Sequence, residues 1–330
     1  MDTGRIMTSV VIPLRNEEAY IEQCLQSLLR QDYPADQLEV LLVDGMSTDR
    51  TCAIIEDYSA RYPYMVLLNN PHKTVPFAMN IGIRAARGRY IVRLDAHSAY
   101  ADNYITKCIE FLEKTGADNV GGVAETRGEG FWGSAIALML SSRFGVGNSA
   151  FRIGAEDGYV DTVPFGAFRR EVFEKYGYYD ERLTRNQDNE MNYRIRKNGG
   201  KIYLTNEIKL TYFSRSTIRG IAKMAFQNGK WNVITSFLCP GTMGVRHFVP
   251  FAFVLSLLLW PLAGLLFNSG FFLKCLALEL ALYLCLNIGF SLAIALKNSF
   301  KYFLALLLLF PLFHICYGWG SLAGLLKQPA

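Results

Sequence analysis

The chain has 330 residues, 51% of them hydrophobic, and a formal net charge of +5 at pH 7. Residues 248–330 contain four lysines, one glutamate and no other charged side chain, so +3 of that charge belongs to this segment and +2 to residues 1–247. The nearly neutral first part excludes the basic surface of a nucleic-acid-binding domain. The seven cysteines form no Cys-x-x-Cys pair, which indicates reduced cysteine and excludes a disulfide framework or a zinc site.

Strand and helix signals alternate through the first hundred residues. Short apolar runs predict strands at 10–12, 38–43, 65–68 and 90–94. Apolar residues at helical spacing predict helices over 21–29 and 77–86, with another that begins at an N-cap from Ser47 or Thr48. Such alternation indicates an α/β fold with a mostly parallel sheet and helices on both faces. In these sheets, the ligand lies at the carboxyl ends of the strands.

The C-terminal part predicts membrane helices. Three apolar stretches, 248–267, 271–296 and 302–326, are each long enough to cross a hydrocarbon core of ~30 Å. Basic residues precede the first stretch and separate the second from the third, whereas 268–270 has none. The positive-inside rule therefore predicts a cytoplasmic first domain and an external C-terminus; an even number of crossings would need a re-entrant span. The N-terminus shows no signal-peptide pattern, which agrees with a cytoplasmic first domain.

The segment between these parts is amphipathic. Residues 217–238 mix apolar side chains with Lys and Arg, a composition typical of helices in the membrane interface. Ordinary packing against a domain is the alternative. The predicted organisation is therefore an α/β domain over 1–214, interfacial amphipathic helices over 215–247 and three transmembrane helices over 248–330.

Four motifs carry a resemblance. They read "VVIPLRNEE", "LLVDGMSTDRT", "AMNIGIRAARGRYIVRLDAH" and "RNQDNEMNYRIRKNGG", in this order between about residues 8 and 205. Together they resemble glycosyltransferase family 2, the inverting enzymes of GT-A (Rossmann-like) fold. With "VPFGAFRREVF" and "DERLTRNQDNE", the chain is most similar to bacterial exopolysaccharide glycosyltransferases of the succinoglycan type. The resemblance implies a cytoplasmic GT-A domain, a UDP-sugar donor and a divalent metal, Mn²⁺ or Mg²⁺.

The donor site implied by the resemblance is built from the residues after the strands. Asp44 is expected to accept the uracil N3–H, and Glu17, beside the turn at Pro13, to contact the nucleoside. Turn formation and helix capping are the alternative for acids in such places, and for Asp49 we prefer that interpretation. The predicted nucleotide-sugar contacts are Pro13, Arg15, Glu17, Asp44, Asn80 and Asp95.

A histidine stands where the family has the second acid of Asp-x-Asp. By the resemblance, Asp95 contacts the ribose and the metal region, and His97 fills the second metal-ligand position. The metal would offset the charge of the leaving UDP. Histidine binds many divalent ions, although imidazole suits Mn²⁺ less well than carboxylate does. His97 is thus expected either to ligate the metal or to hydrogen-bond the phosphate, and a core histidine with a satisfied partner is the alternative.

Inverting transfer to a hydroxyl needs a general base. The family places it at an acid pair that opens a helix, and the match here is Gln187-Asp188-Asn189-Glu190. Gln187 replaces the first acid, which leaves Asp188 as the predicted catalytic base. Glu190 is expected to face elsewhere on the helix. The alternative for Asp188 is an acid favoured only by the helix dipole.

A weaker motif begins at Gln227. The run "QNGKW" is similar to the Gln-x-x-Arg-Trp of processive polysaccharide synthases, in which the tryptophan stacks on the acceptor sugar. Lys230 replaces the arginine and lacks its bidentate fork. Gln227 and Trp231 are therefore predicted acceptor contacts, with interfacial anchoring as the alternative.

The leading hypothesis is a membrane-anchored, metal-dependent inverting glycosyltransferase of the bacterial inner membrane. It would move a hexose from a UDP-sugar to a lipid-linked (polyprenyl diphosphate) saccharide in exopolysaccharide or cell-surface glycan assembly, with membrane lipid and no nucleic acid as partners. A polyisoprenyl-phosphate glycosyltransferase is the alternative, but its acceptor phosphate needs no base. Intact Asp44, Asp95 and Asp188 argue against a non-catalytic membrane scaffold, and three spans are few for processive secretion.

Overall fold

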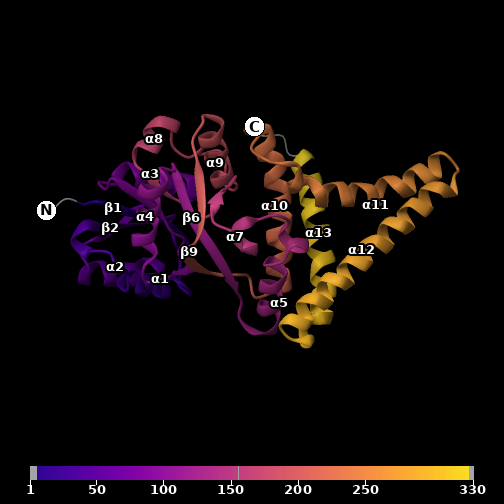
Figure 1. Cartoon of the computed structure of the whole chain (residues 1–330), viewed down its shortest axis with the longest axis horizontal. Coiled ribbons are helices and arrows are strands. Elements are labelled where there is room, and N and C mark those ends of the chain that lie inside the picture. The colour runs from indigo at the N-terminus through magenta and orange to yellow at the C-terminus, as the bar shows by residue number, and fades with distance from the viewer. Residues whose placement is uncertain (1–5, 155, 327–330) are drawn as a thin grey trace. The chain divides into compact units, whose positions relative to one another are not determined.

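Figure 1 shows the computed structural model, which describes residues 6–154 and 156–326. The chain forms two compact units, one from Met1–Glu125 with Gly154–Phe213 and the other from Thr126–Ile153 with Ser214–Ala330. The predicted boundary at residue 214 lies at the junction of the two. Residues 126–153, which we expected in the first domain, group instead with the second unit.

The predicted strands and helices of the first unit are present. The observed strands are β1 (Thr8–Leu14), β2 (Leu38–Asp44), β3 (Met65–Asn69) and β4 (Tyr90–Arg93). The helices that follow the first three strands are α1 (Ile21–Leu29), α2 (Thr51–Arg61) and α3 (Val75–Ala85), and a 3₁₀ turn, η1 (Ala35–Gln37), precedes β2. β1 pairs in parallel with β2 and β4, and β2 with β3. A Cβ on Gly82 of α3 would collide with Val11, so this helix lies close against the sheet.

One helix start was predicted wrongly. α2 begins at Thr51 and has no N-cap from Ser47 or Thr48. The Ser47 side chain donates instead to Asp44 at 2.5 Å, because that carboxylate lies at the end of the preceding strand. Asp49 accepts from the Thr51 amide and hydroxyl at 3.0 and 2.5 Å, in agreement with its expected role at the helix start.

The other half of the sheet is antiparallel. Its strands are β5 (Ser98–Tyr100), β6 (Asn119–Arg127), β7 (Gly158–Tyr159), β8 (Ala167–Arg169) and β9 (Ile202–Phe213). The helices between them in this unit are α4 (Tyr104–Thr115), α8 (Glu171–Tyr176) and α9 (Gln187–Lys197). The nine strands follow the order β3-β2-β1-β4-β8-β6-β9-β5, with β7 beside β9. The sheet is therefore mixed, and the expected parallel order holds only for β1 to β4.

The second unit is helical. It contains α5 (Gly130–Leu140), α6 (Arg143–Val146), α7 (Ala150–Ile153), α10 (Ile218–Leu238), α11 (Val249–Leu266), α12 (Gly270–Lys297) and α13 (Phe303–Leu326), with 3₁₀ turns η2 (Val245–Phe248) and η3 (Phe300–Tyr302). Ile136 and Met139 of α5 are buried in one cluster with Leu309 and Phe310 of α13. This apolar packing explains why 126–153 belongs to the second unit.

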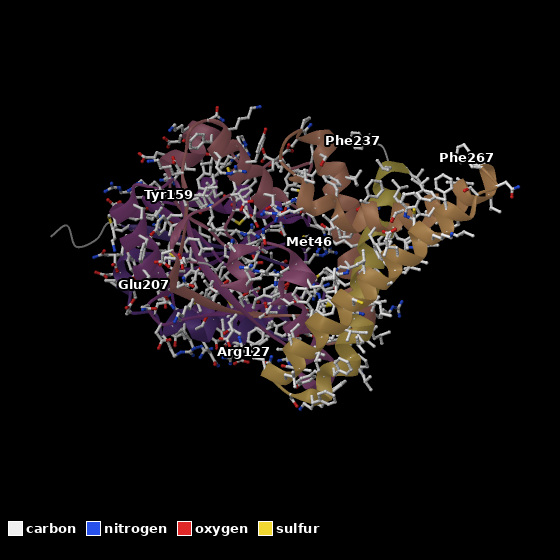
Figure 2. All side chains as sticks on the ribbon, turned by 45° about the vertical axis from the view of Figure 1, so that its right-hand side comes forward. Met46, Arg127, Tyr159, Glu207, Phe237 and Phe267 are labelled. Atoms are coloured by element: carbon white, nitrogen blue, oxygen red, sulfur yellow. The ribbon has the colours of Figure 1, made fainter. Side chains whose placement is uncertain are left out.

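The three predicted spans correspond to α11, α12 and α13, which are long and apolar enough to cross a membrane. Glu279, inside α12, accepts hydrogen bonds from Ser256 and Trp260 of α11 at 2.5 and 2.8 Å, so this carboxylate is paired within the helix bundle. At the turn between these two helices, Phe267 is exposed (Figure 2).

α10 is a single helix where interfacial helices were expected. It packs along α13 so closely that a Cβ on Gly229 would meet the Tyr317 carbonyl, and one on Gly320 would meet the Phe226 carbonyl. Asn232 also donates to the Tyr317 hydroxyl. This face of α10 is covered by protein, as in the alternative of ordinary packing. A position in the membrane interface stays a prediction for the rest of the helix.

Candidate active site

The loops after β1, β2 and β4 meet at the carboxyl ends of the parallel strands. Leu14 of β1 and Asn69 of β3 are both paired in register with Asp44 of β2, so the carboxyl ends of β1, β2 and β3 are level. A pocket of about 170 Å³ lies here, and its lining includes five predicted residues: Pro13, Arg15, Glu17, Asp95 and His97. Two larger hollows, of about 360 and 390 Å³, lie elsewhere on the first unit and are lined by none of the predicted site residues in the described part of the chain.

The pocket has a side formed by residues that sequence reasoning missed. Asn70, Lys73 and Thr74 line it from the segment between β3 and α3. Lys73, whose φ is 65°, is exposed. Arg15, which also lines the pocket, is exposed as well. Two cationic side chains therefore border the pocket, which suits an anionic ligand such as a nucleotide diphosphate. In the sequence, the pair Lys73-Thr74 shortly before the predicted helix could have indicated these pocket residues.

Asp44 is held at the end of β2. Its carboxylate accepts from the Ser47 amide at 3.0 Å and from the Ser47 hydroxyl, and the residue is 6% exposed. The adjoining loops are bound to each other, since the Asn16 side chain accepts from the Thr48 amide at 2.8 Å. A carboxylate has further lone pairs beyond those used by Ser47. The contact between Asp44 and uracil stays a prediction.

Asn80 has a different environment from the one expected for a donor contact. It is 2% exposed on α3, and its amide donates to the Tyr179 carbonyl and to Glu181 at 2.9 and 2.8 Å. Its side-chain oxygen accepts from the Tyr179 amide at 3.0 Å. Asn80 thus fixes the segment that leads to α9, and a contact with the nucleotide sugar stays a prediction.

Asp95 lies on a firmly held turn. Its backbone amide donates to the Tyr100 hydroxyl at 2.7 Å, and that hydroxyl donates back to the Asp95 carbonyl at 3.2 Å. The Cys24 thiol also donates to this carbonyl, at 3.7 Å. Burial raises the pKa of both Tyr100 and Cys24 above their ordinary values, so both stay uncharged at neutral pH. They serve as neutral hydrogen-bond partners of the turn.

His97 pairs with Glu17. The Nδ1 atom of His97 lies 3.3 Å from the Glu17 carboxylate, and both side chains are about one-fifth to one-quarter exposed at the pocket. With Nδ1 donating to this carboxylate, Nε2 carries the ring's lone pair. A carboxylate behind a histidine is the usual arrangement in which the other ring nitrogen binds a metal. No motif in the sequence indicated this pairing.

The donor set fits a metal that is shared with a nucleotide. Within residues 6–154 and 156–326, no group of three His, Cys, Asp or Glu side chains could hold a metal ion. Mg²⁺ is commonly bound by only one or two carboxylates, however, with substrate phosphates and water completing its coordination. Asp95 provides one carboxylate at the pocket and His97 adds an imidazole, and their roles as metal ligands stay predictions.

Arg93 connects the predicted donor contact Asp95 with the predicted base Asp188. Its Nη1 contacts Oδ1 of Asp188, and its Nη2 lies 3.2 Å from Oδ1 of Asp95. The Arg93 side chain is 4% exposed, against 15% for Asp95 and 29% for Asp188. The structure thus brings Asp188, on α9, to the end of β4. Arg93 was missed although it lies within the quoted motif that ends at His97, because nothing local indicates its partners.

The remaining acid of α9 is occupied. Glu190 accepts from Arg194 in bidentate fashion, at 2.9 and 2.7 Å, and Arg194 also donates to the Tyr176 and Tyr178 carbonyls. Glu190 therefore has different partners from Asp188, in line with its expected orientation. Gln187, in the place of the family's first acid, is 8% exposed.

The predicted acceptor contacts belong to the second unit. Gln227 and Trp231 lie one turn apart on α10, and both are half-buried. All other predicted site residues are in the first unit. An acceptor role for these two residues stays a prediction.

Known proteins resemble this chain over most of its length. Residues 9–177 match the family described as Glycosyl transferase family 2. Succinoglycan biosynthesis protein ExoA of Rhizobium meliloti (strain 1021) is 30% identical over 245 residues, which cover 74% of each chain. The dolichyl N-acetyl-alpha-D-glucosaminyl phosphate 3-beta-D-2,3-diacetamido-2,3-dideoxy-beta-D-glucuronosyltransferase of Methanococcus voltae is 26% identical over 327 residues, or 97% of each chain.

Solved structures show the same fold. Mannosyltransferase PcManGT from Pyrobaculum calidifontis, in complex with GDP-Man and Mn²⁺, is 18% identical with a TM-score of 0.62 over 96% of this chain and 88% of that one. S. aureus TarS 1-349, in complex with UDP-GlcNAc, is also 18% identical, with a TM-score of 0.52 over 98% of this chain and 92% of that one. The expected GT-A-like domain, followed by helices able to span a membrane, is confirmed.

Proposed function

Because the chain belongs to glycosyltransferase family 2, we propose that it transfers a hexose from a UDP-sugar to a hydroxyl of a lipid-linked saccharide, with inversion at the anomeric carbon. The observation that supports this most is the joint contact of Arg93 with Asp95 and Asp188. The Asp95 carboxylate lines the pocket at the strand ends, and the other carboxylate, which is still partly exposed, is the proposed base Asp188. Single displacement needs these two functions side by side.

In this mechanism, the UDP moiety lies at the strand ends, where Asp44 accepts the uracil N3–H. Arg15 and Lys73 attract the diphosphate from the pocket edge. Asp95 and His97 would hold a divalent ion, which supplies Lewis-acid stabilisation of the leaving diphosphate when bound. Asp188 accepts the proton of the attacking hydroxyl, whose oxygen bonds to the anomeric carbon as the bond from that carbon to UDP breaks, so UDP leaves and the configuration of the sugar inverts.

The acceptor is proposed to be attached to a membrane lipid. Three helices able to span a membrane support membrane association. The Methanococcus voltae relative is named for transfer to a dolichyl-linked sugar phosphate, which supports a lipid-linked saccharide as acceptor here. A bare polyprenyl phosphate would need no base, so the two acceptor classes differ in their dependence on Asp188. We place the reaction at a bacterial inner membrane with the first unit in the cytoplasm.

Nucleotide release tests the proposed donor. The full chain, purified into lipid, is incubated with Mn²⁺, a lipid-linked oligosaccharide extract and a panel of UDP-hexoses, with GDP-mannose as the comparison. We expect acceptor-dependent UDP release with at least one UDP-sugar. Nucleotide release with GDP-mannose as the sole active donor, or UDP release that does not depend on the acceptor, contradicts the proposal.

Asp44→Ala is expected to weaken UDP binding by ~10-fold or more, because a hydrogen bond to a charged group contributes ~1.5–3 kcal/mol. Isothermal titration with UDP and Mn²⁺ measures the change in affinity. The melting temperature shows whether loss of the Ser47–Asp44 hydrogen bonds has destabilised the fold. Asp36→Ala, an exposed acid in η1, is the control and should bind as the parent does. Unchanged affinity in Asp44→Ala would remove this residue from the uracil site.

The proposed orientation has a topological test. A reporter fused after Ala330 is expected to be active only outside the cytoplasm, because three crossings place the two ends of the chain on opposite sides. A second fusion in the loop at 298–299 should report the cytoplasmic side. Cytoplasmic activity of the C-terminal fusion would show an even number of crossings.

A further inference from the structure

We propose that Arg93 is a positioning residue, which holds the proposed base Asp188 in a fixed place relative to Asp95 at the donor pocket. This inference rests on the proposed function of Asp188. The two contacts come from the two terminal nitrogens of one guanidinium, Nη1 to Asp188 and Nη2 to Asp95. Because the guanidinium is planar and rigid, it sets the separation and direction of the two carboxylates together.

Arg93 has further contacts through both its backbone and its guanidinium. Arg93 is the last residue of β4, and its amide donates to the Gly166 carbonyl at 3.0 Å. The ring of Phe165, the neighbouring residue, lies 5.9 Å from the guanidinium carbon. Asp188 comes from a different element, α9, far along the chain. Because Arg93 belongs to a strand of the central sheet, its guanidinium restrains the Asp188 side chain of α9 relative to that sheet.

The energetics favour geometry over stability as the role of this residue. The Arg93 side chain is 4% exposed, and its Nε atom is buried without a hydrogen-bond partner among the described residues. Burial of a charge with an unsatisfied donor is costly, and a buried ion pair is weak support for stability. The arrangement instead holds the Asp95 and Asp188 carboxylates in a defined orientation, and without the cation between them these carboxylates would repel each other.

A double-mutant cycle tests the inference. Arg93→Lys, Asp188→Asn and the double variant are compared by kcat for transfer, donor KM and UDP affinity, with the full chain in lipid. Lysine keeps the charge but lacks the planar fork, so we expect kcat to fall by ~10-fold or more, since small misplacements of a reacting group cost up to ~10². UDP affinity should change less than ~3-fold, and the arginine change should add little when Asp188 is already Asn.

Arg194→Lys is the matched control. Arg194 also makes a bidentate ion pair with an acid of α9, but its partner is Glu190. For Arg194→Lys we expect a lower melting temperature and a kcat within ~3-fold of the parent, because Arg194 donates to two backbone carbonyls that do not line the pocket. If Arg93→Lys does not fold, Arg93→Gln, which leaves no unpaired cation, carries the same expectations.

The outcomes separate the two proposals. Near-parental kcat in Asp188→Asn would refute the proposed base. A low kcat in Asp188→Asn, together with a near-parental kcat in Arg93→Lys, would overturn only the positioning role. Fully additive losses in the double variant would also overturn it, because Arg93 would then act other than through Asp188.

Discussion

Replacing Asp188 with Asn is expected to lower turnover by ~10²-fold or more, while the UDP dissociation constant stays within ~3-fold of the parent value. Asn keeps the size of the side chain and can still meet Arg93, but it cannot accept the proton of the acceptor hydroxyl. Steady-state transfer kinetics and UDP titration on the same preparation measure both quantities.

Glu190→Gln is the control for this prediction. Glu190 lies two residues away on the same helix and is bound by Arg194. Loss of its charge is expected to reduce stability more than turnover, because breaking this partly buried ion pair leaves Arg194 uncompensated. Equal losses of turnover in the two variants would show that the helix as a whole, and no particular carboxylate, is required.

Removal of divalent metal is expected to reduce transfer by ~10²-fold or more, because Lewis-acid stabilisation of a leaving phosphate contributes several kcal/mol. EDTA should also weaken UDP binding, and added Mn²⁺ or Mg²⁺ should restore both. Calorimetry with UDP in the presence and absence of metal measures the binding part. Equal UDP affinity in EDTA would contradict the metal assignment.

The histidine supplies a sharper form of the same test. His97→Ala is expected to raise the Mn²⁺ concentration for half-maximal activity by ~10-fold or more, as loss of groups around a metal commonly does. His72→Ala is the control, since His72 is exposed and stacks on Phe77 outside the pocket lining. An unchanged metal requirement in His97→Ala would limit His97 to a contact with phosphate or Glu17.

Local patterns were enough to predict one half of the sheet. The strands at 8–14 and 38–44 are buried along their whole length, and each contains a short apolar run that indicates a strand by itself. Part of the antiparallel half escaped prediction because three of its strands, β5, β7 and β8, are short, whereas β6 and β9 are long. β7 has two residues and β8 three, too few for a periodic pattern to identify.

The candidate site shows the same limit. Asp95 and His97 are close in sequence and were predicted together, and the structure places both at one pocket. The contacts of Arg93 with Asp188, and of Asn80 with Tyr179, join residues about a hundred positions apart. Such pairs depend on how β4, α3 and α9 pack, which no local pattern encodes. The same holds for 126–153, whose apolar helix α5 packs with α13.

The anomeric configuration of the first-formed product tests the central claim most directly. An α-linked UDP-hexose, identified as a donor by UDP release, is incubated with the full chain in lipid and the acceptor, and ¹H NMR follows the anomeric proton during the reaction. A single displacement assisted by Asp188 predicts a β-linked product that appears together with UDP. An α-linked first product would show retention and contradict the mechanism.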